Sequence, residues 1–348
     1  MRFRFALACV AAIFLAGAAS AQAAPSCRVD ALNALNVPHI TVTDAKPVAA
    51  KGAVPAHCEV LGTLVTQGAG LPDGSARFSM QLPDGWKQRF LYLGVGGNAG
   101  NLIPSASAVD RQLALGKGYV MVLTDTGHIG DGTTAKWARH PDGSLDRVKV
   151  ADFFHRATHD MTVAGKAFAQ AYYLAPVLHA YFDGCSTGGR MAMIEAERYP
   201  DDYTGIIAGD PAMDYNLNLG RVALQKAALQ KASAYIPPEL LAQIDARVTA
   251  QCDAIDGARD GLVQNPARCP VKAEDLQCKA GQTAACLNPD QTAFLKIYLT
   301  PIRDRQGRQL YAPWQLTHLV GAGGMGFGRS RLAARLETGP RSPGQLDG

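Results

Sequence analysis

The chain has 348 residues, of which 47% are hydrophobic and 18% are charged, and its formal net charge is +4. This length exceeds the roughly 100 to 200 residues of a typical domain, so we expect one large core with an insertion, or two domains. The composition is that of a globular protein, and so small a net charge argues against nucleic acid as a partner.

Residues 1–23 have the pattern of a secretory signal peptide. Arg2 and Arg4 form a basic start, an apolar run follows, and small residues end the segment at Ala19-Ser20-Ala21 or Ala21-Gln22-Ala23. The alternative is a membrane anchor, which would need about 20 apolar residues and a stop signal after them. We therefore expect a secreted or periplasmic protein with no membrane span after cleavage of the signal.

The cysteine content fits an oxidising compartment. Without Cys9, which lies in the predicted signal peptide, seven cysteines remain, so one of them lacks a partner within the chain. Disulfides between sequence neighbours would leave Cys185 unpaired and would join Cys27 with Cys58, Cys252 with Cys269, and Cys278 with Cys286. Many other pairings of six cysteines are possible, so this connectivity is a hypothesis.

Strand and helix patterns alternate between residues 90 and 208. Short apolar runs predict strands at 90–93, 119–123, 178–182 and 205–208, while helical spacing predicts helices between the first two strands, over 152–173 and over 187–199. This alternation predicts a parallel sheet covered by helices on both faces, in an α/β domain that occupies residues 24–211.

The segment Gly184-Cys185-Ser186-Thr187-Gly188 fits the pattern G-x-S-x-G between a predicted strand and a predicted helix. Such a turn presents Ser186 as a nucleophile, and the backbone N–H of Thr187 can donate to the oxyanion of a tetrahedral intermediate. A plain strand-to-helix turn is the structural alternative.

A glycine-rich loop at 94–100 follows the predicted strand 90–93. Hydrolases with this kind of elbow place a second oxyanion donor in such a loop, and Gly96 or Gly97 is the candidate here. The spacing of the glycines does not fit a dinucleotide fingerprint or a phosphate-binding loop.

The character of the sequence changes after residue 211. Residues 212–320 contain helical stretches and four cysteines without further buried-strand patterns, so we expect a separate insertion or a partial cap domain. Residues 321–348 contain eight glycines and no sustained period, which predicts an atypical, poorly ordered tail.

Three carboxylates, Asp253, Asp256 and Asp260, lie within eight residues of the presumed cap. Ca2+ takes about six to eight oxygen ligands, and these carboxylates with the carbonyls of Ala258 and Leu262 could supply most of them. Solvated Asp-Gly turns are the alternative from composition alone.

The motif Gly184-Cys185-Ser186-Thr187-Gly188-Gly189-Arg190, with the segments EAERYP (195–200) and GIIAGDPA (205–212), resembles the tannase and feruloyl esterase family. That family includes a mono(2-hydroxyethyl) terephthalate hydrolase, and the resemblance runs over roughly residues 27–311. It implies an α/β-hydrolase fold with an inserted cap domain, a serine esterase for small aromatic esters such as feruloyl or galloyl esters, and a structural Ca2+ in the cap.

The resemblance also concerns Cys185. In this family the cysteine before the nucleophile is disulfide-bonded to a cysteine directly after the catalytic histidine, but no His-Cys dipeptide follows Ser186 in the present sequence. Acid and histidine should follow the serine in the chain, and only His318 follows Ser186, without a neighbouring cysteine. We therefore expect a C-terminal truncation that removes the triad Asp and His and leaves the chain inactive.

The histidines that precede Ser186 in the family-like segments, namely His128, His155 and His159, are expected to be structural. One alternative function is a non-catalytic, calcium-stabilised pseudoenzyme that binds aromatic esters. A thiol hydrolase or redox protein based on Cys185 is disfavoured, because the sequence contains no C-x-x-C motif.

Overall fold

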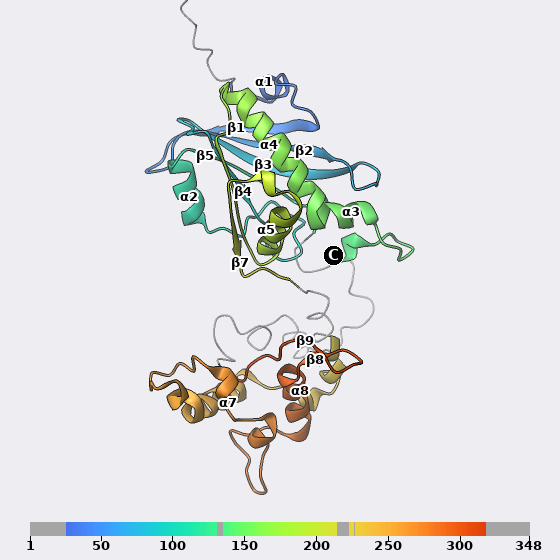
Figure 1. Cartoon of the computed structure of the whole chain (residues 1–348), viewed down its shortest axis with the longest axis vertical. Helices are drawn as coiled ribbons and strands as arrows, with labels where there is room; N and C mark the ends of the chain where they lie inside the picture. Colours follow the sequence, from blue (N-terminus) through green and yellow to red (C-terminus); the bar gives the residue numbers. More distant parts are fainter. Residues whose placement is uncertain (1–25, 131–134, 214–222, 226, 318–348) are drawn as a thin grey trace, which may run out of the picture. The chain divides into compact units, whose positions relative to one another are not determined.

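The computed structural model describes residues 26–130, 135–213, 223–225 and 227–317. The chain divides into two compact units between Met213 and Asp214, one built around a sheet and the other mainly helical (Figure 1). The predicted signal peptide (1–23), the predicted tail (321–348) and His318 lie outside the described residues.

A seven-stranded sheet forms the centre of the first unit, with its strands in the order β1-β2-β3-β5-β4-β6-β7. The strands are β1 (Ile40–Val48), β2 (His57–Thr66), β3 (Gly74–Pro83), β4 (Arg89–Leu93), β5 (Tyr119–Thr124), β6 (His179–Cys185) and β7 (Gly205–Gly209). The pairs from β1 through β3 to β5 are antiparallel, whereas β5, β4, β6 and β7 pair in parallel.

Helices pack against both the antiparallel and the parallel parts of the sheet. They are α1 (Val29–Asn33), α2 (Ala108–Gly116), α3 (Arg147–Ala151), α4 (Ala157–Tyr173) and α5 (Thr187–Arg198), with 3-10 turns η1 (Lys136–Ala138) and η3 (Pro200–Asp202). The helix α4 forms because its apolar side chains recur at helical spacing, and it ends at Leu174, which has a left-handed backbone (φ 54°). One turn of π-helix, η2 (Asp152–Arg156), joins α3 to α4.

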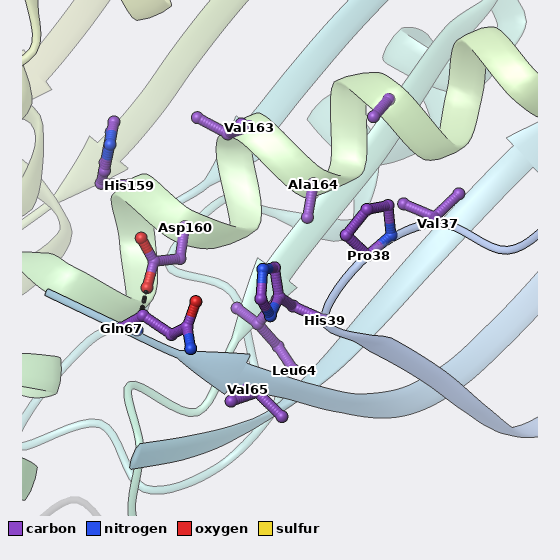
Figure 2. A pocket seen from close by; sticks show the side chains of 11 residues that line it. Val37, Pro38, His39, Leu64, Val65, Gln67, His159, Asp160, Val163 and Ala164 are labelled. Carbon is purple, nitrogen blue, oxygen red and sulfur yellow. Dashed lines mark hydrogen bonds between the residues drawn. The ribbon is translucent and has the colours of Figure 1, made fainter. Parts of the chain in front are cut away.

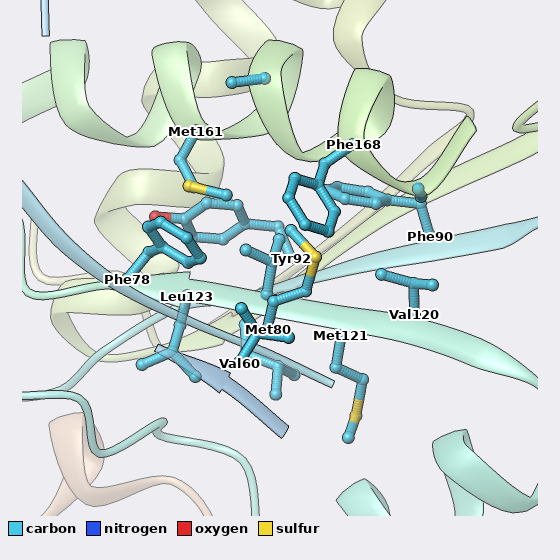
Figure 3. Packing of buried hydrophobic residues seen from close by; sticks show 14 of the residues in the cluster. Val60, Phe78, Met80, Phe90, Tyr92, Val120, Met121, Leu123, Met161 and Phe168 are labelled. Atoms are coloured by element: carbon cyan, nitrogen blue, oxygen red, sulfur yellow. The ribbon is translucent and has the colours of Figure 1, made fainter. Parts of the chain in front are cut away.

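The core of the first unit lies on both faces of the sheet, and α4 covers one of them. In Figure 3, Met161 and Phe168 of α4 pack on one face of the sheet, while Met121 and Leu123 of β5 point to the opposite face. Tyr92 is fully buried in this core, with its hydroxyl 3.0 Å from the Thr124 hydroxyl. The apolar side chains of these strands are therefore buried on both faces of the sheet, as expected for a parallel sheet covered by helices.

The predicted strands at 90–93, 119–123, 178–182 and 205–208 correspond to β4, β5, β6 and β7, and the predicted helix at 187–199 corresponds to α5. The stretch 152–173 begins with the π-turn before α4 starts. The antiparallel part, β1 to β3, was not predicted. In β2, buried residues alternate with more exposed ones along most of the strand, which is the pattern of a strand with one solvated face and differs from a continuous apolar run.

The second unit is built around α7 (Pro238–Cys252) and α8 (Pro289–Leu299). The 3-10 turn η4 (Ala232–Ala234) precedes α7. Three further 3-10 turns connect α7 to α8, namely η5 (Asp253–Asp256), η6 (Pro266–Arg268) and η7 (Ala273–Leu276), and a small hairpin of β8 (Ile302–Arg303) and β9 (Gln309–Tyr311) follows α8. Leu241 and Val248 of α7 and Phe294 of α8 contribute to its apolar core. Asn288 begins α8 with a capping box that includes Gln291.

Three disulfides join the neighbouring cysteines that the sequence pairs: Cys27–Cys58 in the first unit, and Cys252–Cys269 and Cys278–Cys286 in the second. Cys185 is free and exposed. In the part of the chain that the structure describes, no helix combines the length and the hydropathy needed to cross a membrane.

Candidate active site

Ser186 occupies a strained turn between β6 and α5. Its backbone has φ 60° and ψ −118°, a conformation that costs a non-glycine residue free energy and persists only where the surroundings enforce it. Backbone hydrogen bonds hold the turn: the Ser186 N–H donates to the Gly209 carbonyl at 3.0 Å, and the Ser186 carbonyl accepts from Ala212 N–H at 3.0 Å. The side chain is left exposed at the end of β6.

Two glycines allow this turn to form. A Cβ on Gly184 would lie 2.5 Å from the carbonyl carbon of Gly188, so the strand and the helix approach more closely than a side chain permits. A Cβ on Gly94 would lie 2.6 Å from the Gly188 Cα, which shows that the glycine-rich loop packs directly on the elbow. The glycines of the sequence motif therefore correspond to real close approaches.

Thr187 connects the elbow to the loop that follows β4. Its hydroxyl donates to the Gly97 carbonyl at 2.5 Å, and the first N–H groups of a helix such as α5 have no acceptor within the helix. The turn at Gly97 has a positive φ of 59°. The segments that carry the three predicted oxyanion donors, Thr187, Gly96 and Gly97, thus lie together, and the donor role itself remains a prediction.

Ser105 is a positioning residue that the sequence pattern did not identify. Its hydroxyl donates to the Gly94 carbonyl at 2.9 Å and accepts from the Cys185 N–H at 3.1 Å. One hydroxyl therefore bridges the glycine-rich loop and the residue before the nucleophile. No local signal marks it, because the two segments that it joins are distant in the sequence.

His128 supports the same loop from its other end. Its Nε2 lies 2.8 Å from the Asn98 carbonyl, and its ring stacks on Trp137 with a centroid distance of 3.8 Å. Burial lowers the pKa of His128 below its ordinary value, so the ring is neutral at pH 7 and Nε2–H can donate to the carbonyl. These contacts agree with the structural role expected for this histidine.

The other two histidines of the family-like segments lie near the C-terminal end of α5. His155 Nδ1 lies 2.9 Å from the Tyr199 hydroxyl, and His159 Nδ1 lies 2.7 Å from Asp202 Oδ2. In residues 26–130, 135–213, 223–225 and 227–317, no imidazole or carboxylate hydrogen-bonds the Ser186 hydroxyl. The one histidine after Ser186, His318, lies outside these residues.

The predicted calcium loop lies at the end of α7. Its carboxylates accept backbone N–H groups: Asp253 Oδ1 from Gly261, Asp256 Oδ1 and Oδ2 from Ala258 and Gln264, and Asp260 Oδ1 from Leu262, at 2.9 to 3.1 Å. Among the described residues, these three aspartates do not form a cluster with ligand oxygens close to one another. They offer oxygen donors, as Ca2+ requires, and several of these oxygens are engaged by the loop itself.

Comparisons with known proteins were consistent with this geometry. A family model described as "Tannase and feruloyl esterase" matches residues 58–326. A probable feruloyl esterase from Arthroderma benhamiae is 32% identical over 261 residues, which cover 73% of this chain and 46% of that protein. An uncharacterized esterase from Xanthomonas campestris pv. campestris is 33% identical over 321 residues, which cover 88% of this chain and 52% of that protein.

Among solved structures, the crystal structure of feruloyl esterase B from Aspergillus oryzae superposes with a TM-score of 0.67 at 26% identity. The superposition covers 82% of this chain and 58% of that chain. The present chain spans about half the length of the curated relatives that it matches.

Proposed function

The chain belongs to the tannase and feruloyl esterase family, and we propose that it provides the nucleophile of a carboxylic ester hydrolase for esters of aromatic acids, such as feruloyl or galloyl esters. The observation that carries this proposal is the exposed Ser186 in its strained, hydrogen-bonded turn at the end of a parallel strand. A turn with no chemical role would have no reason to keep this backbone strain.

In the proposed reaction the Ser186 hydroxyl attacks the ester carbonyl and transfers its proton to a general base. That proton then passes to the leaving alcohol, and water hydrolyses the acyl-enzyme. The backbone N–H groups of Thr187 and of Gly96 or Gly97 would stabilise the oxyanion. Two sets of hydrogen bonds support this role: the bond from Thr187 to the Gly97 carbonyl, and the bridge through Ser105. They fix the position of the elbow relative to the glycine-rich loop.

The described residues do not place a general base beside the Ser186 hydroxyl. Only His318 follows Ser186, and the residue after it is Leu319, so the His-Cys dipeptide that the family places after the nucleophile does not follow Ser186 here. Loss of a triad member lowers turnover by several orders of magnitude, so turnover by Ser186 depends on a base that meets its hydroxyl. A calcium-stabilised protein that binds aromatic esters without turnover is the second candidate, favoured by the lack of an imidazole at Ser186 within the described residues.

A fluorophosphonate probe tests the nucleophile directly, since it reacts with an activated serine. Labelling of the wild-type chain that disappears in Ser186→Ala and persists in Ser144→Ala, which removes an exposed serine of the same unit, would identify Ser186 as the activated nucleophile. Labelling that does not depend on Ser186 would refute the proposed nucleophile. Binding of methyl ferulate or methyl gallate by calorimetry, without Ser186-dependent hydrolysis, would favour the second candidate.

We also propose Ca2+ as a structural ion at the loop of Asp253, Asp256 and Asp260, as the family resemblance implies. The density of carboxylates and the Cys252–Cys269 disulfide, which closes the loop, support this proposal. Removal of Ca2+ with EDTA should lower the Tm of the wild type, whereas Asp256→Asn should be insensitive. Glu239→Gln, which changes an exposed carboxylate of α7, should respond as the wild type does.

Export to the periplasm or the medium is proposed from the signal-like residues 1–23 and is supported by three disulfides, which persist in oxidising compartments. Mass spectrometry of the protein recovered from an expressing bacterium should show an N-terminus near residues 22–24. An intact N-terminus in the cytoplasmic fraction would contradict export.

A further inference from the structure

We propose that His159, Glu195 and Asp202 form a binding site for a divalent transition-metal ion in the first unit, independently of the esterase function. The three residues come from α4, α5 and η3, and each offers a ligand atom that lies within 4.8 Å of the other two. They are spread over 44 residues of sequence, so only the fold brings them together.

Glu195 is the observation that points to a ligand. Glu195 is fully buried (0% exposed). Neither of its carboxylate oxygens has a hydrogen-bond partner among the described residues. A buried polar group without a partner is costly, and a protonated carboxyl would still need an acceptor for its O–H. A cation at this point would satisfy both oxygens.

His159 and Asp202 complete the donor set. His159 Nδ1 lies 2.7 Å from Asp202 Oδ2, and the ring stacks on Tyr199 at a centroid distance of 3.7 Å, which fixes its orientation. The ammonium group of Lys166 would compete with a metal ion for Asp202. Its Nζ lies 3.4 Å from Asp202 Oδ1 and donates to the Asp202 carbonyl at 2.8 Å. Its long side chain is 21% exposed and can turn toward solvent when a metal ion takes Asp202.

One imidazole and two carboxylates favour Zn2+ or Mn2+ over Ca2+, which prefers oxygen ligands alone. Solvent can reach the site through His159, which is 30% exposed and borders a pocket of about 250 Å³. Figure 2 shows His159 beside Asp160 at the start of α4, with Asp160 and His39 facing the pocket and the His159 ring extending away from His39. Water would fill the remaining coordination positions.

The site lies on the helix that carries the nucleophile. The helix α5 starts directly after Ser186, and Glu195 follows nine residues later, about 14 Å along the axis. A bound ion would therefore join the far end of α5 to α4 and to η3 without touching the reacting atoms. Its role would be to stabilise the first unit and to fix the position of this helix.

The test uses the full 348-residue chain, stripped with EDTA and then titrated with Zn2+ or Mn2+. We expect a rise in Tm of several degrees and a saturable heat of binding for the wild type. Glu195→Gln keeps the shape of the side chain but removes the charge, and it should abolish both responses. Glu197→Gln, on the exposed face of the same helix, is the matched control and should respond as the wild type does.

A second readout and a second variant keep the result interpretable if Glu195→Gln folds poorly. Co2+ should give visible absorption bands that His159→Gln removes, since that change deletes the nitrogen ligand. Asp256→Asn should leave the Zn2+ response intact, which separates this site from the calcium loop. A wild type that does not respond to Zn2+ or Mn2+, or a Glu195→Gln variant that responds fully, would overturn the proposal.

Discussion

Within the described residues, the first unit contains a fully buried ion pair, whereas the pairs Lys231–Asp290, Lys296–Glu274 and Arg308–Asp304 of the second unit each have an exposed basic side chain. Arg156 Nε donates to Asp152 Oδ1 at 2.6 Å, and both side chains are almost fully buried (2% and 1% exposed). In the second unit, Lys296 pairs with Glu274, and each side chain is 53% exposed. Because desolvation of charge is expensive, the buried pair of Asp152 and Arg156 depends on its partners more than the exposed pair of Lys296 and Glu274 does.

The two units also differ in how their chains are held together. The core of the first unit extends over both faces of a seven-stranded sheet, while that of the second joins two helices and several turns. Two of the three disulfides lie in the second unit. Small cores often need covalent cross-links, so we infer that the second unit depends on its disulfides more than the first does.

The largest effect that would sharpen this contrast is expected from Asp152→Ala. The change leaves Arg156 buried without its carboxylate and should destabilise the first unit by about 3 to 5 kcal/mol. Urea unfolding at pH 7, followed by the fluorescence of Trp86 and Trp137, measures the loss. A cost below about 1 kcal/mol would mean that solvent or another group compensates Arg156.

The next effect concerns the cross-link at the end of α7. Replacing Cys252 and Cys269 together by Ser should cost about 3 kcal/mol, because the loop between them, with a sequence separation of 17, regains entropy in the unfolded chain. The matched double variant of Cys278 and Cys286, with a separation of 8, should lose less. Thermal unfolding without reductant compares the two, and the reverse order would contradict the loop-entropy explanation.

A smaller effect is expected from pH through His155. Burial first, and then Arg198 and Arg156, lower its pKa from 6.5 to about 4 in the folded protein. The unfolded chain therefore binds a proton between pH 6.5 and 4 that the folded chain does not, so stability is present above pH 6.5 and falls as the pH drops toward 4. Allowing for solvent screening, we expect a loss of about 1 to 2 kcal/mol.

His155→Gln should flatten this part of the stability profile, because it removes the titrating ring. Urea midpoints measured at several pH values between 7 and 4.5 provide the comparison. His140→Gln, which replaces an exposed histidine of the same unit, is the control. Equal slopes in the wild type and in His155→Gln would show that His155 does not carry the acid sensitivity.

The smallest effect should come from Lys296→Ala in the second unit. An ion pair between two exposed side chains is screened by water and salt, so the urea midpoint should stay within experimental error of the wild type. A clear loss of stability would break the contrast between the two units, since it would show that a surface pair contributes as a buried one does.

The comparison of two acidic groups shows where sequence-based prediction ends. Asp253, Asp256 and Asp260 are conspicuous in the sequence because they lie within eight residues, yet their oxygens mostly accept N–H groups of their own loop. Glu195 and Asp202 attract no attention in the sequence, although the fold places them beside His159. Proximity along the chain favours local hydrogen bonds, whereas packing decides which distant groups share a site.

The sequence by itself determined the features that depend on near neighbours: the elbow at Ser186, the strands and helices of the parallel part, and the pairing of adjacent cysteines. Their periodicity and glycine spacing are local properties of the chain. Only the tertiary structure decided the antiparallel strands β1 to β3, the bridge through Ser105 and the unsatisfied carboxyl of Glu195. Each of these depends on contacts between segments far apart in the sequence, where no periodic signal is available.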